Sequence, residues 1–193
     1  MPPYRAIPFS SYGACGIIKY IKKLRGKIME AIFSRHSVRK FLPKPVEKEK
    51  LERLLQAAMA APSAGNQHPW EFYVVQEPDV LQRLATCSPY AGCCAQAPAA
   101  IVVCKRDKLV RFPGFANLDL SACTENILIE ASYLGLGGVW LALAPYKARM
   151  KATARTLQTA ADSIPFAIVP IGYEAEPKAT VESRYDETRI HWL

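Results

Sequence analysis

Two short apolar runs constrain this chain most, because each has the character of a buried strand. The runs are Ala99–Cys104 and Phe166–Tyr173. Both have the length of a strand and the apolar content that is typical of strands covered on two faces. Even the longer stretch Ala97–Cys104 is too short to cross a bilayer as a helix, so we expect no stable membrane insertion.

Helical segments alternate with the expected strands. In Glu47–Ala60, apolar residues recur at the three- and four-residue spacing of a single buried stripe, and Leu118–Leu134 is expected to be a long helix. The alternation predicts an α/β or α+β domain with a covered sheet. The remaining expected elements are a short helix at Met29–Phe33, a strand at Glu71–Gln76, a helix at Asp79–Ala85, a strand at Val139–Leu143 and a helix at Tyr146–Leu157.

The positive charge of the chain is concentrated at one end. The 193 residues carry a formal net charge of +8 and are 50% hydrophobic, which suits one globular domain. Residues 1–28 hold six lysines and arginines and no acidic residue, so the rest of the chain is nearly neutral. A nucleic-acid partner would depend on that segment alone, and we expect none.

Residues 1–28 allow several interpretations. Gly16–Ile28 can form a short basic amphipathic helix that lies on a membrane surface. A secretory signal is a poor match, because proline, serine and glycine interrupt Ala6–Ile18. We favour an extension upstream of a native start at Met29, since the charge changes sharply there, and we place the folded domain at residues 29–193.

The six cysteines do not suggest a metal site. No C-x-x-C pair occurs, and the adjacent Cys93-Cys94 is not a usual zinc spacing. Several lie in apolar contexts, where free cysteine packs as a small hydrophobe. We therefore expect reduced, structural thiols, no bound metal and a cytoplasmic location.

The pentapeptide Arg35-His36-Ser37-Val38-Arg39 is a candidate phosphate site. It places two arginines and a hydroxyl within five residues at the end of a short helix. The guanidinium group offers several fixed donors that match the geometry of a phosphate. The alternative interpretation is a solvated basic turn, because charged residues are usually just exposed.

Pro62-Ser63-Ala64-Gly65-Asn66, followed by Pro69-Trp70, is a candidate contact for a flat ring. Small residues let such a ring approach the backbone, and glycine permits unusual dihedral angles. The amide of Asn66 offers both a donor and an acceptor. The alternative interpretation is an ordinary loop between a helix and a strand.

Two further patterns lie in the second half of the chain. The glycines of Leu134–Leu143 do not form a dinucleotide fingerprint, because Trp140 stands where the last glycine would be. They are better explained as a tight junction between a helix and a strand, whose backbone can then lie along the edge of a cofactor. Arg184, in a polar tail, would by itself be interpreted as a surface residue.

In this order and at these separations, the motifs resemble those of the nitroreductase family. Its short members carry an R-x-S-x-R element, a PSAxN-x-x-PW element, a GLG-x-x-W turn and an arginine near the C-terminus that is often followed by Ile-His-Trp. This chain has the corresponding residues at 35–39, 62–70, 135–140, 184 and 190–192. The resemblance covers roughly residues 29–193.

The resemblance implies an α+β fold, a three-layer sandwich with a central mixed β-sheet flanked by helices, in an intertwined homodimer with FMN at the interface. Arg35, Ser37, Arg39 and Arg184 would hold the phosphate and ribityl chain of FMN, with His36 contributing from the same loop. Backbone groups near Leu141 and Ala142 would face the N5 edge of the ring. The partner subunit would contribute the remaining residues, Pro62, Ser63, Ala64 and Asn66.

The resemblance also implies the chemistry. It predicts an oxidoreductase that passes electrons from NAD(P)H through flavin N5 to nitroaromatic, quinone or similar small acceptors by a ping-pong mechanism, with no catalytic side chain. The alternatives are dehalogenation, ene reduction or flavin destruction on the same scaffold, or a non-catalytic flavin-binding protein. Gly138 and Ala142 depart from the residues that are common in the family, and Lys105–Asn117 is the best candidate for a lid.

Overall fold

A computed structural model describes residues 30–176 and 183–193. The interpretations of residues 1–28, and the boundary drawn before Met29, lie outside this part of the chain. The expected short helix is present at residues 30–34. The other predicted helices and strands all appear within a few residues of their expected bounds, apart from the strand at Val139–Leu143.

The centre of the molecule is a sheet whose long strands pair antiparallel. The strands β1 (Trp70–Val75), β2 (Ala99–Arg106) and β5 (Ser163–Gly172) lie in that order, and the short strands β3 (Gly137–Gly138) and β4 (Leu141–Ala142) both pair with β5. A parallel bridge between residues 37 and 138 makes the sheet mixed. The predicted buried runs are therefore its two central strands.

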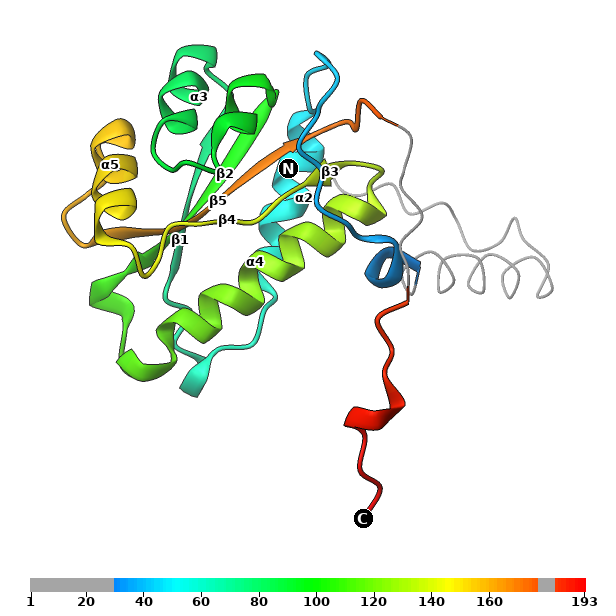
Figure 1. Ribbon diagram of the computed structural model, residues 1–193. Coiled ribbons are helices and arrows are strands. Elements are labelled where there is room, and N and C mark those ends of the chain that lie inside the picture. Colours follow the sequence, from blue (N-terminus) through cyan, green and yellow to red (C-terminus); the bar gives the residue numbers. More distant parts are fainter. Residues whose placement is uncertain (1–29, 177–182) are drawn as a thin grey trace, which may run out of the picture.

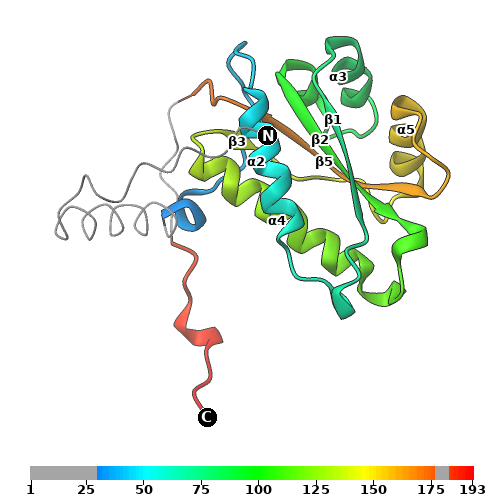
Figure 2. The same cartoon turned by 180° about the vertical axis from the view of Figure 1, so that it is seen from behind.

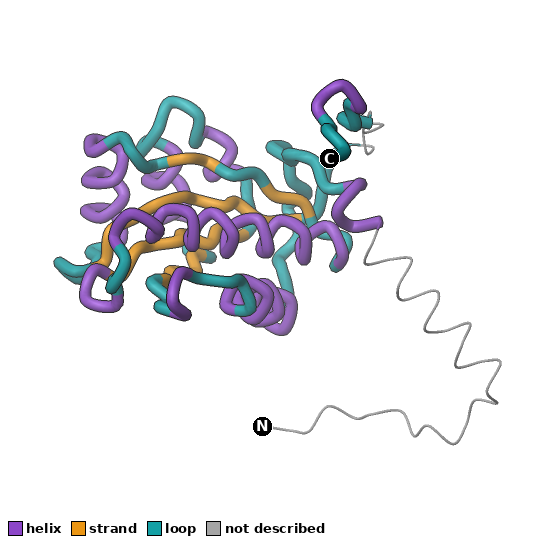
Figure 3. Tube along the Cα trace, turned by 90° about the horizontal axis from the view of Figure 1, so that it is seen from below, coloured by secondary structure: helices purple, strands orange, loops and turns teal. Residues whose placement is uncertain are grey.

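Helices cover both faces of this sheet, which makes three layers (Figure 1). On one face lie α2 (Lys48–Met59) and α4 (Ala116–Tyr133), and on the other lie α3 (Pro78–Ala85) and α5 (Lys147–Leu157). Figures 2 and 3 show the same arrangement from behind and from below. Short 3-10 turns occupy Ala64–Asn66, Gly92–Gln96, Asp107–Leu109, Pro113–Phe115 and Glu187–Arg189.

Strand β2 divides the core into two halves. Its residues alternate between faces, as side chains on any strand must. Ile101 and Val103 pack into the cluster that holds Leu54 of α2 and Ile127 of α4. Their neighbours on the strand, such as Val102, pack into the cluster on the side of α3 and α5. This double burial explains why β2 is apolar at nearly every position.

The expected strand at Val139–Leu143 is broken into β3 and β4, and this is a correction. The two pieces keep one register, because Gly138 faces Ile171 and Leu141 faces Ile168. In that register, Val139 lies opposite Pro170, which has no N–H to donate to the ladder. The proline therefore interrupts the pairing.

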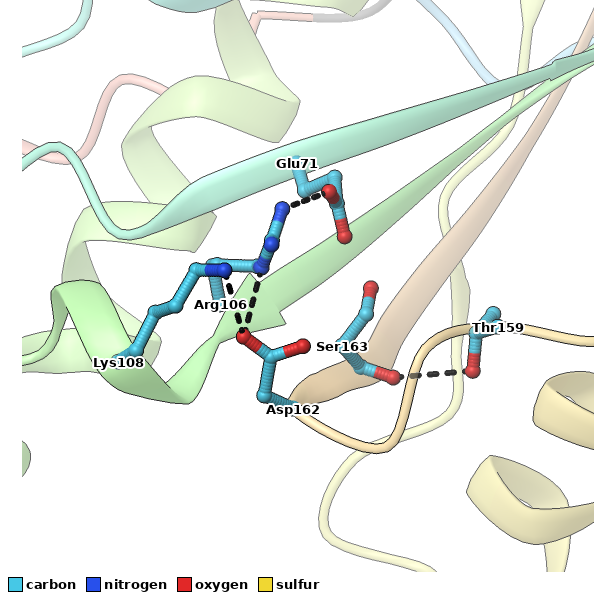
Figure 4. A network of polar contacts seen from close by, with 6 residues as sticks. All are labelled: Glu71, Arg106, Lys108, Thr159, Asp162 and Ser163. Carbon is cyan, nitrogen blue, oxygen red and sulfur yellow. Dashed lines mark hydrogen bonds and ion pairs between the residues drawn. The ribbon is translucent and has the colours of Figure 1, made fainter.

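An ion-pair network joins the ends of β1, β2 and β5 (Figure 4). Arg106 of β2 binds Glu71 of β1 and places its Nε 2.9 Å from Oδ2 of Asp162. Lys108 Nζ lies 3.4 Å from the same oxygen. The hydrogen bond from Arg106, followed by that from Lys108, holds the pKa of Asp162 below its usual value. The network therefore has a structural role, because it links the ends of neighbouring strands.

Candidate functional site

The basic pentapeptide lies directly beside the glycine-rich turn. Ser37 forms a parallel bridge with Gly138, and the N–H of Val38 donates to the Gly138 carbonyl at 3.0 Å. Val38 is buried, and a Cβ on Gly137 would lie 2.5 Å from its Cγ2. Only glycine allows this approach without displacement, so the structure brings the first and third predicted motifs together.

The side chains of the pentapeptide alternate in their surroundings. Val38 is buried, whereas Ser37 and Arg39 on either side of it are exposed. Arg35 is partly buried and places its Nε 3.3 Å from Oε1 of Glu125. Arg35 ends the preceding short helix, because its N–H donates to the carbonyl of Ala31, and Ser37 and Arg39 follow it along the edge next to Gly138. The structure thus leaves a strip with one hydroxyl and two cations beside the sheet.

His36 lines a pocket of about 160 Å³ beside the end of α4, together with Arg35, whereas Ser37 and Arg39 do not line it. Its Nε2 lies 2.8 Å from Oε1 of Glu174, and its Nδ1 lies 3.1 Å from the carbonyl oxygen of Ser34. Both ring nitrogens therefore face acceptors, and a protonated imidazole satisfies both. The His36 side chain fixes the segment, and any contribution of this residue to a ligand on the strip would come from its backbone.

Strand β4 continues the edge to which the pentapeptide belongs. The Leu141 side chain is buried in the half of the core next to α5, whereas Ala142 is exposed. The carbonyl of Ala142 accepts a hydrogen bond from Nη1 of Arg149 at 3.3 Å. Trp140, between the two short strands, is partly buried and packs edge-on against Phe166 at the margin of the core.

The loop after α2 is held by two buried polar side chains. Oδ1 of Asp119 accepts from the N–H of Ala64 at 2.9 Å, and Oδ2 accepts from Nε2 of Gln67 at 2.6 Å. Oε1 of Gln67 in turn accepts from the N–H groups of Arg111 and Phe112, each at 2.9 Å. Sequence analysis missed Gln67 and Asp119, because only the fold places them together.

The same loop has an unusual backbone. Gly65, Asn66 and His68 have φ values of 53°, 56° and 47°, in the left-handed region. Such conformations cost free energy for non-glycine residues, less for asparagine and histidine than for most others, and they occur in tight turns and at binding sites. Ser63 Oγ accepts from the N–H of His68 at 3.1 Å. The exposed Asn66 makes no side-chain hydrogen bond within the described residues, so its amide is available to a ligand.

The two groups of predicted residues are anchored at opposite ends of α4, and the Arg35 side chain reaches Glu125 at the middle of the helix. The loop at Pro62–Asn66 is tied to Asp119 in the first turn, whereas the pentapeptide meets the glycines that follow the last turn. Gly135 ends the helix with φ 71°, as predicted. With 18 residues, α4 is about 27 Å long. One chain therefore does not bring all the predicted site residues together.

The lid candidate Lys105–Asn117 is anchored to the loop after α2 rather than free. Its backbone binds Gln67, and the Phe112 ring lies so close to Gly65 that a Cβ added there would overlap with it. Phe112 and Phe115 of this segment are 45% and 54% exposed, and Leu118, which follows in α4, is 64% exposed. A group of large apolar side chains on the surface is typical of an interface.

Residues 183–193 run away from the body of the molecule in Figure 1. Arg184 is exposed, and no hydrogen bond or ion pair joins its side chain to the other described residues. Trp192 is 91% exposed. The structure of one chain therefore does not place Arg184 with Arg35 and Arg39.

Cys93 differs from the other described cysteines. Cys87, Cys94, Cys104 and Cys123 are buried, as expected for structural thiols, and burial raises the pKa of Cys104 to about 12. Cys93 is only half-buried. The hydrogen bond with Cys94, together with the charge of Arg39, lowers the pKa of the Cys93 thiol to about 7. Nothing in the sequence distinguishes this cysteine from the others.

Comparisons with known proteins decide the family. The family model described as "Nitroreductase family" matches residues 32–88. A protein of Methanothermobacter thermautotrophicus, provisionally named NADH dehydrogenase/NAD(P)H nitroreductase, is 38% identical over 164 residues, which is 85% of each chain. The chain belongs to the nitroreductase family. This confirms the predicted family, and with it the α+β sandwich described above.

Two solved structures have the same fold as this chain. A Clostridium acetobutylicum protein, provisionally titled NADH oxidase, is 40% identical, with a TM-score of 0.81 over 83% of this chain and 97% of its own. The FMN-dependent nitroreductase of Clostridium difficile R20291 is 29% identical, with a TM-score of 0.76 over 85% of this chain and 98% of its own.

The part of the chain that the structure describes has neither a membrane-spanning helix nor a cluster of metal-binding side chains. No helix there has the length and apolar character needed to cross a membrane. No group of three or more histidine, cysteine or acidic side chains in residues 30–176 and 183–193 is arranged to hold a metal ion.

Proposed function

We propose that this protein is an FMN-dependent oxidoreductase that transfers electrons from NAD(P)H to small organic acceptors such as nitroaromatics and quinones. One observation carries the proposal: Arg35, Ser37 and Arg39 lie on a strip that is bridged to Gly138, on the sheet edge that leads to Ala142. The relatives named NAD(P)H nitroreductase and the FMN-dependent nitroreductase of Clostridium difficile support it.

The strip fits a phosphate. Arg39 is exposed and has no acidic partner among the described residues, so all its donors are available. Ser37 adds a hydroxyl. The Nε of Arg35 lies 3.3 Å from Oε1 of Glu125, and this ion pair orients the guanidinium. Two arginines can balance most of the charge of a dianionic phosphate through charge-assisted hydrogen bonds.

The residues beyond the strip fit a flat ring. Gly137 and Gly138 bring the backbone close to the pentapeptide, and Ala142 presents only a methyl group to the surface. When bound, FMN supplies the capacity to accept and donate a hydride at N5. The chain would bind and orient the ring, and we assign no side chain as a general acid, base or nucleophile. Donor and acceptor would then use one site in turn, in a ping-pong sequence.

We further propose a homodimer, because one chain anchors its two groups of site residues at different ends of the 18-residue helix α4, which is about 27 Å long. Pro62, Ser63, Ala64 and Asn66 of one copy would then complete the strip of the other. The exposed Phe112, Phe115 and Leu118 beside this loop supply apolar surface for the interface. The tail with Arg184 would extend across the second copy. We expect the dimer to be cytoplasmic.

The test is to purify the full chain and measure its bound flavin and its reduction. We expect a yellow dimer that releases FMN on denaturation and whose flavin is bleached by NADH or NADPH in a stopped-flow instrument. Reoxidation by a nitroaromatic or quinone should then regenerate the spectrum. A colourless protein that neither binds added FMN nor oxidises NAD(P)H would contradict the proposal.

Variants locate the flavin site. Arg35→Ala and Arg39→Ala should each weaken FMN binding by about tenfold or more, since each removes a charge-assisted bond to phosphate. Arg83→Ala is the matched control, because it removes an exposed arginine from α3 on another part of the surface. Equal FMN affinity in all three variants would reject the phosphate assignment.

A further inference from the structure

Helix α5 is basic and lacks acidic residues. It carries Lys147, Arg149, Lys151 and Arg155, and none of the four forms an ion pair with a described residue. Elsewhere the cations are commonly paired, as Arg106 is with Asp162 and Lys40 is with Glu176. Unbalanced positive charge on one helix creates a local potential that attracts anions.

Arg149 is the cation of this helix that the structure holds in one place. Its guanidinium carbon lies 4.0 Å from the centre of the Tyr146 ring and 5.4 Å from that of Tyr90. One of its N–H groups donates to the carbonyl of Ala142 at 3.3 Å. Stacking on aromatic rings orients a guanidinium without using its hydrogen-bond donors. Most of the donors of Arg149 therefore remain free.

Arg149 lies next to strand β4. Its hydrogen bond to Ala142 places it beside the exposed end of β4. Tyr146 and Tyr90 are 55% and 71% exposed, so the group opens to solvent. A molecule whose reactive ring lay against β4 could thus reach this cation with a neighbouring anionic group.

We propose that Arg149, oriented by Tyr146 and Tyr90, binds the phosphate groups of the dinucleotide electron donor. This inference rests on the proposed function, since it takes β4 as the edge on which donor and flavin meet. A nicotinamide dinucleotide carries its diphosphate close to the reacting ring, and guanidinium is well matched to phosphate oxygens. Nitroaromatic and quinone acceptors carry no such group, so the cation serves the donor.

Stopped-flow reduction of the FMN-loaded enzyme tests the proposal. In Arg149→Ala, we expect the Kd for both NADH and NADPH to rise by about tenfold or more. The limiting rate of flavin reduction and the FMN content should be unchanged. Arg149→Lys should recover part of the affinity, because it keeps the charge but loses the planar fork. Arg155→Ala, which removes an equal charge from the same helix, should leave the Kd as in the wild type.

A second arm identifies which substrate the cation serves. Reoxidation of the reduced Arg149→Ala enzyme by a neutral quinone and by a nitrobenzoate should proceed as in the wild type. An unchanged Kd for both donors, a loss confined to the nitrobenzoate, or a loss of bound FMN would each overturn the proposal. Failure of the proposed function would look different, because then the wild type itself would not bind FMN or be reduced.

Discussion

The two ends of α4 hold their neighbouring segments by different means. At the first turn, Asp119 and Gln67 fix the loop at Pro62–Asn66 through buried hydrogen bonds between polar groups. Beyond the last turn, the pentapeptide is held by a backbone bridge, by contact between Val38 and Gly137 and by the partly buried pair of His36 with Glu174. The first region is specified by buried polar partners. The second is specified by a close approach that only glycine permits and by partly exposed ion pairs of Arg35 and His36, and Arg39 has no acidic partner among the described residues. Substitutions in the two regions should therefore affect stability and FMN binding differently.

The largest expected effect on stability comes from removing the buried carboxylate that holds the loop at the first turn of α4. Asp119→Ala would leave the N–H of Ala64 and the amide of Gln67 without their buried acceptor. We expect the free energy of unfolding to fall by about 2–4 kcal/mol, measured by urea denaturation. The exposed carboxylate of Asp79 provides the control, since Asp79→Ala should have little effect. Equal stability of both variants would show that this hydrogen-bond pair does not fix the loop.

A smaller loss of stability should follow from adding a side chain at Gly137, beyond the last turn of α4. In Gly137→Ala, the new Cβ would lie 2.5 Å from Cγ2 of Val38, so the pentapeptide must shift. We expect a loss of about 1–3 kcal/mol of stability, together with weaker FMN binding, measured by denaturation and flavin titration.

The origin of that loss can be tested by a double mutant. Val38→Ala removes the atoms that the new methyl group meets, so Gly137→Ala should cost less in that background. Gly114→Ala is the matched control, because a Cβ there would meet nothing within 4 Å. Additive losses for Gly137 and Val38 would indicate that the glycine is needed for another reason.

The smallest effect concerns chemical reactivity beside the strip. The pKa of Cys93 lies at about 7, so its thiolate fraction should rise as the pH increases through neutrality. Cys104 and Cys123, with pKa values raised to about 12 by burial, should stay protonated. Iodoacetamide labelling with mass spectrometry should find Cys93 modified first, with a midpoint near its pKa.

Arg39 provides the link between that reactivity and the strip. Because its charge lowers the pKa of Cys93, Arg39→Ala should move the labelling midpoint to higher pH, whereas Arg83→Ala should not. Bound FMN should protect Cys93 if its phosphate lies on Arg39. Labelling that is insensitive to Arg39 would separate the thiol from the strip.

Local patterns predict much of this fold because they report local physics. The apolar content of β2 follows from burial of both its faces, and the glycine after α4 follows from the left-handed backbone that ends the helix. The break between β3 and β4 was not predicted, because Pro170 acts on Val139 from 31 positions away, across the sheet. The candidate site likewise has residues that local patterns reveal and residues whose role depends on distant partners.

Residue types suggested the strip and the loop, since arginines beside a serine and a run of small residues have recognisable chemistry. Gln67, Asp119 and Cys93 escaped notice, because each acquires its role from a partner brought close by folding. Arg149 is a similar case. In the sequence it is one of several cations on a helix, and only the positions of Tyr90 and Tyr146 distinguish it.

The length of α4 has a consequence for how the protein would behave at low abundance. If its two ends serve two different ligands in a pair of copies, then assembly and cofactor capture are linked by mass action. Each molecule of FMN would hold the pair together, and each pair would hold its FMN more tightly. Dilution should then separate the two copies and release FMN together, so the occupancy of the flavin site would depend on how much protein the cell makes.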